Sequence, residues 1–206
     1  MWLLLPPRPP LQEELPRLTI IAHASRSGTT LLTRMAAVRG DALCLREPRF
    51  LMTVLAAPAQ SPLRALAPAF LPSILRAFVV FAGRRGLVPI VKLPSAASTA
   101  EQLRAISAAA PRARRVAVVR PLVDIVASQR AYGPHREAST EELAQIFASR
   151  RDAAEGWAEV VLPYDDVVFA DDGPRTLAVA LGLREPTRAQ RAACLRERRY
   201  DAKSTR

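Results

Sequence analysis

The sequence is poor in cysteine, histidine and aromatic residues, and each scarcity excludes a class of protein. Its only cysteines, Cys44 and Cys194, are too few for a disulfide framework and lack the spacing of metal ligands. The only histidines, His23 and His135, are also far apart, so we expect no metal cofactor. Aromatic residues make up 5% of the chain, too few for the stacking platforms of proteins that bind single-stranded nucleic acids.

Long hydrophobic runs are missing as well. The apolar start, residues 1–5, is too short for the core of a signal peptide and is followed at once by prolines. The most apolar later stretch, residues 65–83, contains Arg76, Pro68 and Pro72 and falls short of the roughly 20 clean apolar residues of a membrane span. We therefore expect a cytoplasmic protein with no membrane span, in which residues 65–83 form a buried or groove-lining helix.

Acidic residues are outnumbered by basic ones. The chain has 30 Lys and Arg against 19 Asp and Glu, and its formal net charge of +11 favours anionic partners. Residues 184–206 contribute eight basic and three acidic side chains, which is typical of a solvated basic tail. Nucleic acid is a disfavoured partner, because the chain has no recognisable helix for reading bases.

The chain is long enough for one hydrophobic core, since it has 206 residues of which 50% are hydrophobic. We expect one domain over residues 1–206, with a proline-rich lead at 1–16 and a basic C-terminal helix and tail at 184–206. Apolar runs of strand character occur at residues 18–24, 42–45, 88–91, 115–119 and 159–162. Stretches with helical spacing or helix-start signals separate these runs. The alternation predicts an α/β fold, a three-layer parallel sheet with helices on both faces.

Some helices carry more specific signals. In the helix expected at 62–82, the residues Leu66, Phe70, Ile74 and Phe78 form one apolar stripe. Residues 98–101 and 139–142 have the sequence of capping boxes, which predicts helix starts there. Gly182 has the position of a helix C-cap.

Polar residues follow the expected strands directly. They are Ser25 to Thr30, Arg46, Glu47, Lys92 and Arg120. Because ligands of parallel α/β sheets bind at the carboxyl ends of the strands, these residues are the candidates for a binding site.

The loop Ser25-Arg26-Ser27-Gly28-Thr29-Thr30 joins the first strand to a helix. Glycine in such a turn lets backbone N–H groups converge on an anion, and the helix dipole adds roughly half a positive charge. The sequence therefore predicts a phosphate site, with an ordinary polar turn as the alternative interpretation. The loop lacks the lysine and the first glycine of the GxxxxGK[ST] motif, which disfavours an ATPase or a kinase.

Two segments resemble the nucleotide-binding motifs of the sulfotransferases. Residues 26–30, Arg-Ser-Gly-Thr-Thr, resemble the family's 5′-phosphosulfate loop. Arg120, at the end of the clearest strand, and Ser128, eight positions later, resemble the pair that clasps the 3′-phosphate. Two weaker matches, residues 91–94 (Val-Lys-Leu-Pro) and 163–167 (Pro-Tyr-Asp-Asp-Val), are similar to the family's Lys-x-Pro and Tyr-Glu-Asp-Leu segments.

The resemblance implies a P-loop nucleotide-binding fold and a metal-independent sulfuryl transfer from 3′-phosphoadenosine 5′-phosphosulfate to an acceptor hydroxyl or amine. It implies that Glu47 is the base and that Arg26 and Lys92 stabilise the departing phosphate. The co-substrate would be bound by Ser25, Arg26, Ser27, Gly28, Thr29, Thr30, Arg120 and Ser128.

Each of these roles has a plainer alternative. Glu47 can be an exposed turn carboxylate paired with Arg46 or Arg49, and Lys92 a lysine that extends from the strand end to solvent. His23 at the end of the first strand is more typical of a buried structural histidine than of a base.

The chain also departs from the family pattern. Arg120-Pro-Leu replaces the usual Arg-Asp-Pro, and the C-terminal part has no Arg-Lys-Gly. Two alternatives therefore stay open, a nucleotide-binding protein of the same fold that has lost catalysis and, less favoured, a P-loop kinase for a small molecule.

Overall fold

The fold is built on one five-stranded parallel sheet. The computed structural model describes residues 16–197, apart from residue 56, residues 58–59 and residues 133–136, so the proline-rich lead before residue 16 and the basic tail after residue 197 lie outside it. The strands are β1 (Thr19–His23), β2 (Ala42–Arg46), β3 (Val88–Lys92), β4 (Arg114–Val119) and β5 (Val160–Pro163). Their order in the sheet is β2-β3-β1-β4-β5, and all four pairings are parallel.

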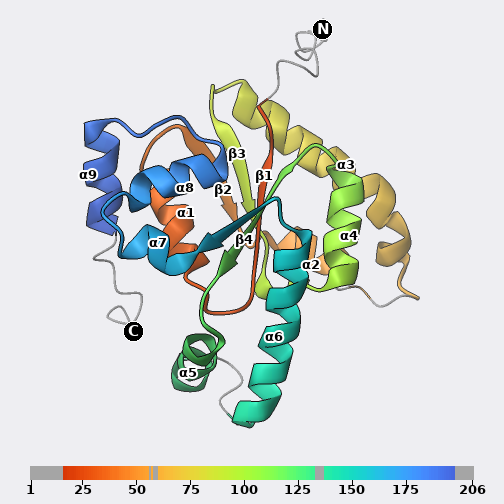
Figure 1. Ribbon diagram of the computed structural model, residues 1–206. Coiled ribbons are helices and arrows are strands. Elements are labelled where there is room, and N and C mark those ends of the chain that lie inside the picture. The colour runs from red at the N-terminus through yellow and green to blue at the C-terminus, as the bar shows by residue number, and fades with distance from the viewer. Residues whose placement is uncertain (1–15, 56, 58–59, 133–136, 198–206) are drawn as a thin grey trace, which may run out of the picture.

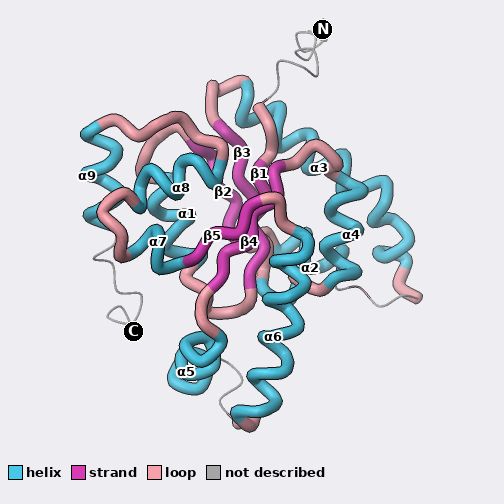
Figure 2. The backbone as a smooth tube through the Cα atoms, viewed as in Figure 1, coloured by secondary structure: helices cyan, strands magenta, loops and turns pink. Residues whose placement is uncertain are grey.

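Helices cover both faces of this sheet (Figures 1 and 2). One face packs against α2 (Arg49–Leu55), α3 (Pro62–Gly83), α4 (Ala100–Ala109) and α6 (Thr140–Trp157). The other face packs against α1 (Thr29–Ala37), α7 (Tyr164–Val168) and α8 (Gly173–Leu181), and α9 (Arg188–Glu197) packs outside them against α1 and α8. A short 3-10 helix, η1 (Ser95–Ala97), follows β3, and the remaining α-helix, α5 (Leu122–Tyr132), lies beside α6 beyond the carboxyl end of β4 (Figure 1). The expected three-layer α/β architecture is confirmed.

The central strand β1 shows why the layers form. All five of its residues are buried, with Ile20 and Ala22 in the core on one face and Ile21 in the core on the other. Successive side chains of a strand point to opposite faces, so a continuous apolar run fits a strand that is covered on both sides.

The helix caps confirm two predictions and correct a third. Ser139 and Glu142 form a complete capping box at the start of α6, and Gly182 ends α8 in the left-handed conformation with φ of 69°. The box at the start of α4, however, is formed by Thr99 and Gln102 and not by residues 98 and 101. Ser98 is buried, and its Oγ accepts a hydrogen bond from the backbone N–H of His23 at 3.3 Å, so it belongs to the core.

The apolar stripe that the sequence indicates on the long helix α3 is not the face that packs in the core. The residues of α3 in the core are Ala67, Leu71, Leu75 and Ala82. Leu66 and Phe70 are instead 58% and 44% exposed, and Ile74 and Phe78 are half-buried. Because α3 is apolar around most of its circumference, its sequence did not determine which face would pack.

Candidate functional site

The residues predicted for the site gather at the carboxyl edge of the sheet. β1 leads into the loop before α1, β2 ends one residue before Glu47, β3 ends at Lys92 and β4 ends one residue before Arg120. Arg46 and Lys92 are register partners in adjacent strands, which brings Glu47 next to Lys92. Since β1 lies between β3 and β4, the loop lies between Lys92 on one side and Arg120 on the other.

The loop presents the bare start of a helix. Gly28 is the N-cap of α1 and has φ of 78°, no side chain caps this terminus, and the first turn has no acidic residue. The N-terminal N–H groups and the helix dipole therefore favour an anion here. Ser27 is fully buried beside this terminus, and its Oγ has no hydrogen-bond partner among the described residues.

An aromatic ring from the end of β5 packs on this loop. A Cβ atom at Gly28 would lie 2.0 Å from the ring of Tyr164, so only glycine permits this contact. The Arg120 guanidinium carbon lies 5.3 Å from the centre of the same ring, within the range of a cation–π interaction. Burial raises the pKa of Tyr164, and the charge of Arg120 acts in the opposite direction. Tyr164 thus joins the two phosphate motifs that the sequence suggested.

Helix α5 is attached to the loop by two contacts. The Ser25 hydroxyl donates to Gln129 Oε1 at 3.4 Å, and an Arg26 guanidinium nitrogen donates to the carbonyl of Tyr132. Gln129 is fully buried, and its Nε2 has no hydrogen-bond partner among the described residues. Ser128, the residue before it, is half-buried on α5.

Arg120 precedes α5 and pairs loosely with that helix. Its Nε lies 3.5 Å from Asp124 Oδ2, an ion pair too long for a hydrogen bond, so this buried nitrogen has no hydrogen-bond partner in the described part of the chain. The structure thus places Arg120 and Ser128 on the same short segment but gives no contact between them.

Lys92 connects the loop to Glu47. Its Nζ donates to Thr30 Oγ1 at 3.0 Å and to Glu47 Oε1 at 2.5 Å. The Lys92 side chain is 3% exposed and that of Glu47 is 49% exposed. Burial lowers the pKa of Lys92, and the bond to Glu47 opposes that shift. Glu47 therefore pairs with Lys92 and not with Arg46 or Arg49, and Lys92 is not the solvent-reaching lysine of the alternative interpretation.

Backbone strain also occurs at this edge. Arg26 and Glu47, with φ of 58° and 49°, are the non-glycine residues with positive φ in the described part of the chain. A non-glycine residue in this region costs of order 1–3 kcal/mol, and such residues concentrate at functional sites. Here both are residues predicted for the site.

His23 lies beneath the edge and is buried, as expected of a structural histidine. Its Nδ1 and Nε2 lie 2.6 Å and 2.9 Å from the carbonyl oxygens of Ala24 and Leu93. Those oxygens favour the protonated ring, but burial and then the charge of Lys92 outweigh them and lower the pKa of His23 to about 4. The ring is therefore neutral at pH 7 and donates only one hydrogen bond, to one of these two carbonyls.

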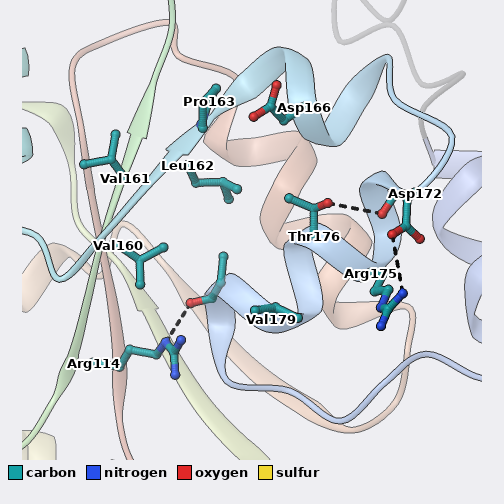
Figure 3. Close-up of a pocket in the computed structure, with 11 residues that line it drawn as sticks. Arg114, Val160, Val161, Leu162, Pro163, Asp166, Asp172, Arg175, Thr176 and Val179 are labelled. Atoms are coloured by element: carbon teal, nitrogen blue, oxygen red, sulfur yellow. Dashed lines mark hydrogen bonds and ion pairs between the residues drawn. The ribbon is translucent and has the colours of Figure 1, made fainter.

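Two pockets lie away from these residues. The pocket in Figure 3 has a volume of about 360 Å³ and lies between β5 and α8. Two of its polar side chains already have hydrogen-bond partners in the pocket wall. Arg114 Nε donates to the carbonyl of Ala180 at 2.9 Å, and Thr176 Oγ1 donates to that of Asp172 at 3.3 Å. A groove of about 710 Å³ runs between α3 and the turn before β4. Neither contains a residue predicted for the site.

The donor set at the carboxyl edge suits an anion. Five buried side-chain atoms in the described residues lack a hydrogen-bond partner, and three of them, Ser27 Oγ, Arg120 Nε and Gln129 Nε2, surround the loop. All three can donate, and an unpaired buried donor costs about 1–3 kcal/mol, which an anion with several acceptor oxygens would recover. No group of three or more His, Cys, Asp or Glu side chains arranged for a metal ion occurs among the described residues.

Sequence reasoning missed two residues of this arrangement, Gln129 and Tyr164. Gln129 comes four positions after buried Ile125, so its polar side chain at a core-facing helical position was a signal. Tyr164 lies in residues 163–167, one of the segments that resemble the family. Its contact with Gly28 depends on tertiary packing, so the sequence did not indicate it.

Comparisons with known proteins do not assign the chain to a family. No protein-family model matches it, and no curated protein matches its sequence significantly.

Proposed function

We propose that this protein binds 3′-phosphoadenosine 5′-phosphosulfate at the carboxyl edge of its sheet and transfers the sulfuryl group to an acceptor hydroxyl or amine. The observation that carries the proposal is a set of buried donors that have no hydrogen-bond partner among the described residues, Ser27 Oγ, Arg120 Nε and Gln129 Nε2, around the start of α1. ATP alone would not call for a second phosphate site at Arg120, whereas a 3′-phosphate would.

Two anchors hold the nucleotide in this proposal. The loop Ser25 to Thr30 receives the 5′-phosphosulfate through backbone N–H groups, the buried Ser27 hydroxyl and the Thr29 and Thr30 hydroxyls. Arg120, with Ser128, receives the 3′-phosphate, and a guanidinium can do so with two parallel hydrogen bonds. Tyr164 fixes the spacing of the two anchors, because its ring contacts both Gly28 and Arg120.

The transfer is an in-line displacement at sulfur. A bond forms between the acceptor oxygen or nitrogen and sulfur, while the bond between sulfur and the bridging phosphate oxygen breaks. The acceptor proton goes to a Glu47 carboxylate oxygen. The negative charge that develops on the leaving phosphate is stabilised by Lys92, Arg26 and the N-terminus of α1.

The contact between Lys92 and Glu47 gives this mechanism a defined starting state. While Lys92 donates to Glu47 Oε1 at 2.5 Å, the carboxylate is oriented and one of its two oxygens is hydrogen-bonded. When Lys92 turns to an anionic phosphate, Glu47 keeps its strained backbone position, and both of its oxygens can then receive the acceptor proton. Because Lys92 is nearly fully buried, it can make this exchange over a short distance without being solvated.

The direct test is transfer of radiolabelled sulfate from the donor to a panel of hydroxyl and amine acceptors. We expect Glu47→Gln to lower the rate about 10²- to 10⁴-fold, the usual contribution of a general base. Glu141→Gln, an exposed glutamate on α6, is the matched control and should leave the rate unchanged.

Undiminished transfer by Glu47→Gln would remove Glu47 as the base. Tight binding of 3′,5′-adenosine bisphosphate without transfer to any acceptor would favour the catalytically inactive alternative. Magnesium-dependent turnover of ATP would favour the kinase.

A further inference from the structure

Helix α3 has an apolar face that is exposed. The exposed residues recur at helical spacing along a face beside the buried stripe and include Leu63, Leu66, Phe70 and Phe81, which are 44%, 58%, 44% and 48% exposed. Contrary to the expectation from its sequence, the stretch Ala65–Gly83 is by length and composition apolar enough to cross a membrane, and only 28% of it is buried within the protein. A helix that is apolar on all sides is normally enclosed, so this face calls for a partner.

The charges on α3 and on the segments that flank it in sequence are all positive. Between Glu47 and Glu101 the sequence has six basic residues and no acidic one. Arg84 and Arg85 are exposed at the end of α3, and the Arg85 guanidinium carbon lies 3.6 Å from the centre of the Phe81 ring. Basic side chains therefore border the apolar face directly.

The groove beside α3 repeats this combination. Its apolar lining includes Pro72, Leu75 and Val79, and Arg76 and Arg112 also line it. In the described part of the chain, neither arginine has an acidic side chain within ion-pair distance. The groove therefore combines apolar side chains and positive charge along the length of α3 that it borders.

We propose that this surface, the exposed side of α3 with Arg76, Arg84, Arg85 and Arg112, docks on an anionic lipid bilayer. Apolar side chains on one helix face, bordered by arginines, are the pattern of a helix that lies in the membrane interface. The apolar side chains enter the acyl boundary while the arginines contact lipid phosphates. The helix lies along the bilayer and does not cross it, since its buried stripe remains packed on the sheet.

A second copy of the chain fits this surface less well. A twofold contact places the same patch on both subunits, so arginines of one α3 would face arginines of the other. No acidic residue between positions 48 and 100 could neutralise them. An anionic bilayer supplies both the apolar phase and the opposite charge.

Flotation with two kinds of vesicle tests the proposal, one of phosphatidylcholine alone and one with about a third phosphatidylglycerol. We expect the protein to partition onto the anionic vesicles and Arg84→Gln/Arg85→Gln to lose about thirtyfold in partition, roughly fivefold for each basic residue. The control Arg188→Gln/Arg196→Gln, on α9, has the same net charge and should bind as the wild type does.

A second pair of variants tests the apolar face. Leu66→Ser/Phe70→Ser should lose at least tenfold in partition, while Val179→Ser/Ile146→Ser, equally exposed apolar positions on α8 and α6, should lose nothing. Equal losses in variant and control would overturn the proposal. A second result would also overturn it: the wild type does not bind vesicles but forms dimers in sedimentation, and Leu66→Ser/Phe70→Ser abolishes these dimers.

Discussion

Two buried cations, Arg39 and Lys92, lie in different surroundings. The Arg39 side chain is fully buried in the turn before β2, where it donates to both carboxylate oxygens of Asp41 at 3.0 and 2.7 Å and to the carbonyl of Arg184 at 2.6 Å. Lys92, at the opposite end of the sheet, is bound by a half-exposed carboxylate and a threonine hydroxyl in the first turn of α1.

We propose that this difference separates a structural cation, Arg39, from a functional one, Lys92. The partners of Arg39 belong to the fold, because they fasten the turn before β2 to the segment after α8. The partners of Lys92 border an edge with unsatisfied donors and strained backbone, and a bound phosphate can replace them. Breaking the first arrangement should cost stability, and breaking the second should cost binding.

The largest effect on stability is expected at Arg39. Arg39→Leu leaves Asp41 and the Arg184 carbonyl without their donor, so we expect the free energy of unfolding to fall by about 3 kcal/mol. Below the unfolding midpoint, binding of 3′,5′-adenosine bisphosphate should be unchanged. Urea unfolding with titration calorimetry checks both, and a binding defect larger than the stability defect would contradict the comparison.

Gly28→Ala should damage both properties. The new Cβ meets the Tyr164 ring at 2.0 Å and sits on a backbone with φ of 78°, so we expect a loss of about 2 kcal/mol in stability. Displacement of Tyr164 should also lower bisphosphate affinity. Gly86→Ala has a similar φ of 65° but open space around its Cβ, so it controls for backbone strain and should bind normally.

His23, which lies near Lys92, should make the stability of the protein depend on pH. Its pKa is about 4 in the folded protein against 6.5 in the unfolded chain, so the unfolded state binds the proton first as pH falls. Its contribution is fully present above pH 6.5 and is lost as the pH falls from 6.5 to 4, and about 2 kcal/mol of stability has been lost at pH 5. His23→Gln should flatten that part of the stability curve, and a curve parallel to that of the wild type would contradict this pKa.

The smallest effect on stability is expected at Lys92. Lys92→Met keeps the volume and removes the buried charge, and Glu47 is exposed enough to be solvated, so stability should change by less than about 1 kcal/mol. Bisphosphate affinity should fall at least tenfold. A stability loss like that of Arg39→Leu, with normal binding, would make Lys92 a structural cation too.

Much of this arrangement could be predicted from the sequence. The strand ends, and hence the grouping of Glu47, Lys92, Arg120 and the loop at one edge, follow from apolar runs that end in polar residues. Local signals were sufficient there, because each strand is a short apolar run, fully buried in β1 and partly exposed in the edge strands β2 and β5.

The contacts across the edge could not be predicted. Lys92 contacts Glu47 because of the register between β2 and β3. Tyr164 contacts Gly28 because β5 pairs in parallel with β4, the neighbour of β1, and so ends at the same edge of the sheet. Neither relation is local in sequence. The buried face of α3 was also undetermined, because apolar residues occur on both of its sides.

The central claim, a two-phosphate site at the carboxyl edge, is tested most directly by ligand-induced thermal stabilisation. We predict that 3′,5′-adenosine bisphosphate raises the melting temperature more than equimolar ATP does, since only the bisphosphate engages both anchors. Arg120→Ala should remove most of that preference, while Arg188→Ala on α9 should keep it. Equal stabilisation by the two nucleotides, or a preference that survives Arg120→Ala, would contradict the account.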